Sequence, residues 1–94
     1  MKLDDEQKSI ITEKLKRENA TSIVVFGSYA RGDANRDSDV DILANFEDEK
    51  TLIDMNRIER ELSEILGMKV DLVTENSISP HISRKISEKE VLLA

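Results

Sequence analysis

Three aspartates interrupt stretches that are otherwise apolar, and they are the residues best suited to chemistry. Asp39 and Asp41 stand two residues apart, and Asp71 lies between Val70 and Leu72. Because strand side chains alternate between two faces, Asp39 and Asp41 are predicted to face the same way, with Cα atoms roughly 6.5–7 Å apart. Neighbouring carboxylates repel each other and are costly to desolvate, and a divalent cation between them removes both penalties.

Oxygen-only ligation suits Mg²⁺, which completes its coordination shell with water and substrate phosphates. If the strand that carries Asp71 neighbours the other, three acids could orient an in-line displacement at phosphorus. Asp71 could also accept the proton of the attacking hydroxyl. On its own, an Asp-x-Asp pair is also compatible with a solvated edge strand or a calcium loop. An EF-hand is disfavoured because its glycine and distal glutamate are missing.

A glycine-serine turn precedes these acids and could hold a phosphate. Gly27 lets the backbone approach a ligand closely, and the hydroxyl of Ser28 and nearby N–H groups would meet the negative charge. Arg31 could reach a phosphate or pair with an aspartate, and both roles stay open. The turn is not a Walker A loop, because no Gly-Lys-Ser/Thr is present. On its own, it also fits an ordinary connection between a strand and a helix.

The periodicity predicts helices over residues 4–18, 29–32, 52–66 and 80–86, and strands over residues 22–26, 38–46 and 68–74. Residues 91–93 fit a terminal strand or a packed tail, and the only histidine, His81, is expected on the surface. This alternation predicts an α/β fold with helices packed on a small sheet, but leaves the strand order undetermined.

The third predicted helix has the clearest boundaries. Thr51 is a candidate N-cap with Asp54 as the partner of a weak capping box, and Gly67 fits the end of the helix. One face is predicted to be core or a subunit contact and carries Met55, Ile58, Leu62, Ile65 and Leu66.

Composition narrows the classes of partner. The 94 residues are expected to form one domain, 1–94, with a net charge of −6. An acidic surface with a single tyrosine, two phenylalanines and no tryptophan disfavours independent nucleic-acid binding and fits divalent cations or a basic protein. The absence of cysteine fits the cytoplasm, and neither a signal peptide nor a membrane segment is expected.

Taken together, residues 27–32, 38–42 and 70–72 resemble the signature of the DNA polymerase beta-type nucleotidyltransferase superfamily. The length is similar to that of its smallest branch, the minimal nucleotidyltransferases, which are often antitoxins of HEPN proteins. The resemblance implies a small mixed β-sheet flanked by helices, a palm-like α/β fold. It also implies two Mg²⁺ ions on Asp39, Asp41 and Asp71, with Gly27 and Ser28 on the triphosphate.

The implied reaction is the transfer of AMP from ATP to a tyrosine of the paired HEPN ribonuclease toxin. The sequence continues for only about twenty residues after Asp71, so another polypeptide is expected to build the acceptor site. Two alternatives remain open. One is an antitoxin that neutralises by contact without transferring AMP, and the other is a subunit of an enzyme that modifies a small molecule such as an aminoglycoside.

Overall fold

The computed structural model describes residues 3–35 and 37–74, together with the backbone of residues 90–92. In chain order, the elements of this part are α1 (Asp5–Arg17), β1 (Ala20–Phe26), α2 (Ser28–Arg31), β2 (Val40–Phe46), α3 (Leu52–Leu66), β3 (Val70–Val73) and β4 (Glu90–Leu92). None of the helices in the described part is both long and apolar enough to cross a membrane.

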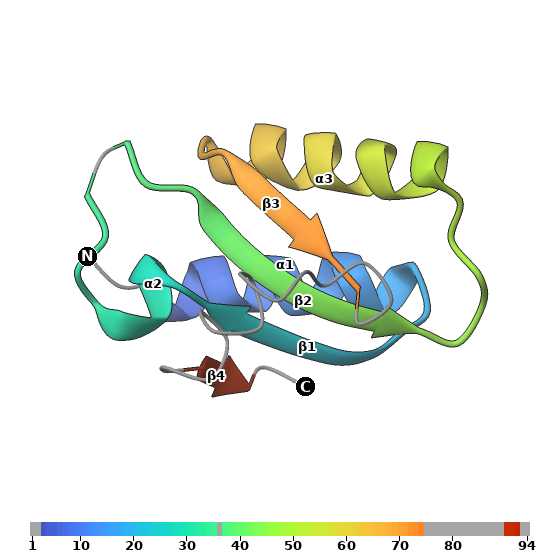
Figure 1. The fold of residues 1–94 in the computed structure, drawn as a ribbon, viewed down its shortest axis with the longest axis horizontal. Coiled ribbons are helices and arrows are strands. Elements are labelled where there is room, and N and C mark those ends of the chain that lie inside the picture. The colour runs from blue at the N-terminus through green and yellow to red at the C-terminus, as the bar shows by residue number, and fades with distance from the viewer. Residues whose placement is uncertain (1–2, 36, 75–89, 93–94) are drawn as a thin grey trace.

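The strands form one mixed sheet in the order β3-β2-β1-β4 (Figure 1). β1 pairs antiparallel with both β2 and β4, whereas β2 pairs parallel with β3. The mixed sheet with helices confirms the expected fold class. β4 confirms the terminal strand, one of the two possibilities that the sequence left for that segment.

The main core lies between the sheet and the two long helices. Val40 and Ile42 of β2 are fully buried there, as are Ile58 and Leu62 of α3. Because side chains alternate along a strand, the residues between these strand positions face the opposite side of the sheet. The core packing of β2 therefore directs Asp41 away from the helices.

Most predicted helix boundaries are confirmed. The side chain of Thr51 accepts a hydrogen bond from the N–H of Asp54, and Asp54 returns the bond, which completes the capping box. Gly67 ends α3 in the left-handed conformation, with φ of 68°. On the predicted apolar face, Ile58 and Leu62 are buried in the core, whereas Ile65 is 56% exposed near the end of α3. A subunit contact, the other role predicted for this face, stays a prediction for Ile65.

Two strands are shorter than predicted. β2 begins at Val40 and β3 at Val70, rather than at residues 38 and 68. The predicted helix over residues 80–86, with His81, lies outside the described residues.

Candidate active site

The end of β1 and the starts of β2 and β3 meet at one side of the sheet. Asp41 is the register partner of Phe26 on β1 and of Asp71 on β3. Adjacent strands lie about 4.8 Å apart, so the two aspartates are immediate neighbours on the face opposite the helices. Asp41 is partly buried and Asp71 is exposed. The sheet therefore brings together two of the three predicted acids.

Asp39 lies just before β2, and the prediction that it belongs to the strand was wrong. The ladder with β3 starts one residue later, where the N–H of Val40 donates to the carbonyl of Lys69 at 2.8 Å. The preceding loop has its own bonds, from the N–H of Asn35 to Ser38 Oγ at 2.9 Å and from the N–H of Ser38 to the carbonyl of Asn35 at 3.1 Å. The alternation of a strand therefore does not fix the direction of the Asp39 side chain.

Lys69 is the cation next to Asp39. Its Nζ lies 3.8 Å from Asp39 Oδ2, and the lysine side chain is 79% exposed. In the part of the chain that the structure describes, no group of three acidic, histidine or cysteine side chains lies close enough together to hold a metal ion. As donors, the three carboxylates still fit Mg²⁺, which prefers oxygen ligands.

Gly27 makes room for Asp41. A Cβ at Gly27 would overlap with Asp41 Oδ2 and would lie 3.3 Å from its Cγ. Gly27 also has φ of 73°, a conformation that other residues rarely adopt. The close approach of the Asp41 carboxylate therefore explains why position 27 is a glycine, and the sequence alone did not reveal this contact. Its contact with a phosphate stays a prediction.

Ser28 begins α2, and Gly32 ends that helix in the left-handed conformation. The first turn of a helix leaves N–H groups without acceptors inside the helix, as the phosphate hypothesis requires. Arg31 Nε donates to Asp33 Oδ2 at 3.2 Å. This is an ion pair with an aspartate, one of the two roles that the sequence left open for Arg31.

Two side chains of α3 hold β3 in place, and neither was predicted from the sequence. The N–H of Val70 donates to Ser63 Oγ at 3.0 Å, and the N–H of Leu72 donates to Glu59 Oε2 at 2.8 Å. These bonds satisfy donors on an edge strand, on both sides of Asp71. The only signal in the sequence was two polar residues, four apart, beside the apolar face of the helix.

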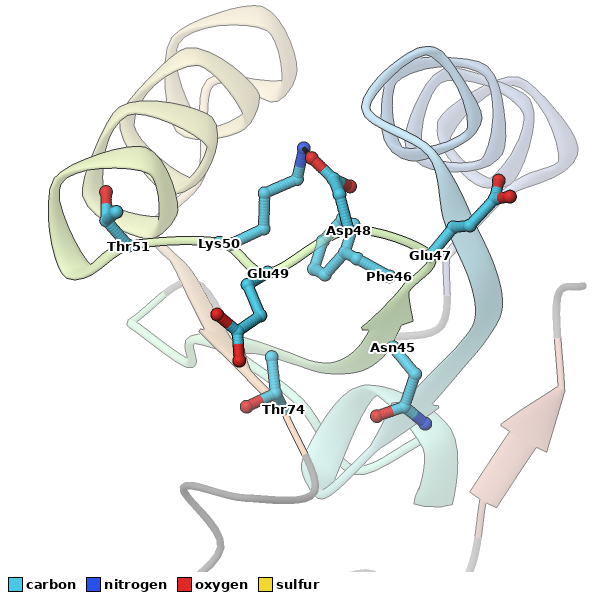
Figure 2. Close-up of a pocket in the computed structure, with 8 residues that line it drawn as sticks. All are labelled: Asn45, Phe46, Glu47, Asp48, Glu49, Lys50, Thr51 and Thr74. Atoms are coloured by element: carbon cyan, nitrogen blue, oxygen red, sulfur yellow. Dashed lines mark hydrogen bonds and ion pairs between the residues drawn. The ribbon is translucent and has the colours of Figure 1, made fainter.

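The described residues also contain a cavity of about 630 Å³ at the opposite end of β2 (Figure 2). None of the predicted site residues lines it. Lys50 is one of the lining residues, with Nζ 2.9 Å from Asp48 Oδ2 and 5.4 Å from the centre of the Phe46 ring. Lys50 lowers the pKa of Asp48 by its hydrogen bond. The cavity is lined by Asn45, Phe46, Glu47, Asp48, Glu49, Lys50, Thr51 and Thr74.

Comparisons with known proteins agree with this geometry. Residues 6–93 match the nucleotidyltransferase domain family. The chain is 40% identical over 91 residues to the protein adenylyltransferase MntA of Thermococcus cleftensis, covering 93% of this chain and 92% of MntA.

Two solved structures share the fold. A toxin–antitoxin complex with AMP-PNP superposes with a TM-score of 0.82 at 27% identity, covering 93% of this chain and 72% of that one. The complex of a tri-AMPylated Shewanella oneidensis HEPN toxin with an MNT antitoxin superposes with a TM-score of 0.78 at 22% identity. This match covers 98% of this chain and 72% of that one. The resemblance to minimal nucleotidyltransferases is thereby confirmed, and the chain belongs to the nucleotidyltransferase domain family.

Proposed function

We propose that this protein is an antitoxin that transfers AMP from ATP to a tyrosine hydroxyl of a HEPN-type ribonuclease toxin. One observation carries the proposal. Asp41 and Asp71 are register partners on parallel strands, and Gly27 leaves space for the Asp41 carboxylate. The name of the Thermococcus relative, a protein adenylyltransferase, supports this class of reaction. The fold is also one that occurs bound to an AMPylated HEPN toxin.

In this proposal, Asp39, Asp41 and Asp71 would hold two Mg²⁺ ions. The ions would neutralise charge on the phosphates and make the acceptor hydroxyl more acidic. Ser28 and the backbone at Gly27 bind the triphosphate, and Arg31 assists if it exchanges Asp33 for a phosphate oxygen. The acceptor oxygen bonds to the α-phosphorus, the bond to pyrophosphate breaks, and Asp71 takes the hydroxyl proton.

The net charge of the chain and its need for ATP support the proposed partner and location. A ribonuclease presents cationic groups to RNA, and a chain of net charge −6 is complementary to them. The same charge disfavours direct binding of nucleic acid by this chain. The proposal includes a cytoplasmic location, where ATP is supplied.

Mass spectrometry of the partner tests the proposal. The purified chain is incubated with ATP, Mg²⁺ and the HEPN protein encoded beside it, and the partner is then analysed intact and as peptides. We expect the mass of one or more adenylyl groups on a tyrosine, with release of pyrophosphate. Asp39→Ala and Asp41→Ala should each abolish the modification, and chelation of Mg²⁺ by EDTA should do the same.

Other outcomes support the alternatives. Tight binding without modification, with neutralisation that survives Asp41→Ala, would identify an antitoxin that acts by contact. Modification of an aminoglycoside but not of the protein would identify a small-molecule nucleotidyltransferase.

A further inference from the structure

Two neighbouring apolar side chains project into solvent at the start of α3. Leu52 is 77% exposed and Ile53 is 80% exposed, the highest values among the large hydrophobic residues that the structure describes. The helix start does not depend on them, because Thr51 and Asp54 form the capping box. Isolated exposed apolar residues are ordinary, but contiguous exposed apolar residues are typical of a contact surface. Leu52 directly follows Thr51, which lines the cavity at the end of β2.

The loop before α3 adds negative charge beside this pair. Glu47, Asp48 and Glu49 are consecutive and exposed. Lys50 does not cancel all three charges, because it pairs with Asp48 and its side chain is only 9% exposed. We call Glu47, Asp48, Glu49, Leu52 and Ile53 the loop-helix surface.

The loop-helix surface adjoins the cavity at the end of β2. Figure 2 shows the Glu49 side chain extending toward Thr74, and both residues line the cavity. A volume of about 630 Å³ has room for one or more partner side chains. The Lys50–Asp48 ion pair and the capping box hold the loop and the helix start, so little conformational freedom would be lost on binding.

We infer that the loop-helix surface docks a segment of the toxin in which apolar side chains are flanked by lysine or arginine. The inference rests on the proposed function, because it takes the HEPN toxin as the partner. Charge selects this occupant over a second copy, which would bring the same carboxylates and a net charge of −6. Leu52 and Ile53 act as anchors within a larger interface.

The surface and the candidate active site lie at opposite ends of β2. Docking and chemistry are therefore separable by substitution. A variant of the loop-helix surface should bind the toxin weakly and raise KM for the toxin while kcat stays nearly unchanged.

Calorimetric titration of the HEPN toxin with three forms of the full chain tests the inference. The double variant Leu52→Ser/Ile53→Ser removes the apolar pair, and serine is well tolerated at a helix start. Ile65→Ser is the matched control, because Ile65 is also exposed on α3 but near its other end. We expect the double variant to raise Kd at least tenfold and the control to raise it less than twofold. Circular dichroism verifies that each variant is folded.

A charge variant provides an independent measurement. Glu47→Lys/Glu49→Lys should weaken binding, and the remaining affinity should depend less on salt concentration than that of the wild type. If both double variants bind the toxin like the wild type while AMP transfer persists, the inference is overturned and the proposed function stands.

The wild-type reaction separates the two claims. If the wild type neither binds nor modifies the toxin, the proposed function fails and the inference fails with it. A dimer of the chain alone that the serine pair abolishes would identify a second copy as the occupant and would overturn the inference.

Discussion

The two ends of β2 both carry acidic side chains, but in different surroundings. At the end of the strand, Asp48 is paired with Lys50 at 2.9 Å. At the start, Asp41 faces Asp71 across two parallel strands, and a glycine beneath it leaves space for its carboxylate. Asp48 and its lysine stabilise a loop, whereas Asp41 and Asp71, held side by side, provide charge for a ligand. The comparison identifies which carboxylates in an acidic chain are candidates for chemistry.

The largest effect should come from removing one charge at the start of β2. Asp41→Asn preserves the shape of the side chain but removes the negative charge of a proposed Mg²⁺ ligand. The rate of AMP transfer should therefore fall on the order of 10³-fold. The matched change Asp48→Asn at the other end should alter kcat, measured at saturating toxin, less than twofold. Pyrophosphate release measured with the HEPN partner provides both rates. Equal losses of activity in the two variants would contradict the assignment of catalysis to the start of β2.

Glycine substitutions test the close approach of Asp41. Gly27→Ala adds a Cβ that overlaps with the Asp41 carboxylate at a φ of 73°, so the free energy of unfolding should fall by about 2–4 kcal/mol. Gly67→Ala, at φ 68° and ψ 25°, lies in the left-handed helical region with open space for the Cβ and should cost about 1 kcal/mol. Gly27, with ψ of −150°, lies where residues with a Cβ are rare, so backbone strain adds to the overlap there. Urea denaturation measures both values. Equal costs would contradict the requirement for a glycine beside the Asp41 carboxylate.

Local signals in the sequence predicted much of this arrangement. The Thr51 cap and the Gly67 helix end depend on residues nearby in the chain, and both are confirmed. Which aspartates meet depends on the strand order, which local patterns do not encode. The start of β2 at Val40 likewise depends on where its pairing with β3 begins.

The bonds from α3 to β3 test how Asp71 is positioned. Glu59→Ala leaves the N–H of Leu72 without its side-chain acceptor and should lower the free energy of unfolding by about 1–2 kcal/mol. Glu59→Gln retains an oxygen acceptor and should cost less. Hydrogen exchange at the amide of Leu72 should accelerate most in the alanine variant. Unchanged exchange in both variants would contradict this positioning role.

The smallest effect is a pH dependence at the start of α3. Hydrogen bonds from the backbone and side chain of Thr51 lower the pKa of Asp54 from 3.8. A lowered pKa stabilises the fold fully above about pH 5, and this stability is lost as pH falls through the pKa of the folded state. Thermal unfolding from pH 6 to pH 3 should show a smaller decline in Tm for Asp54→Asn than for the wild type. Parallel declines would show that Asp54 does not contribute.

Backbone amide NMR of the chain titrated with ATP and Mg²⁺ compares the two ends of β2 most directly, because it needs no partner. The account predicts that the largest shifts occur at Gly27, Ser28, Asp41 and Asp71, with residues 45–51 nearly unchanged. Shifts concentrated in residues 45–51, with the start of β2 unaffected, would contradict the assignment of the nucleotide to the paired aspartates.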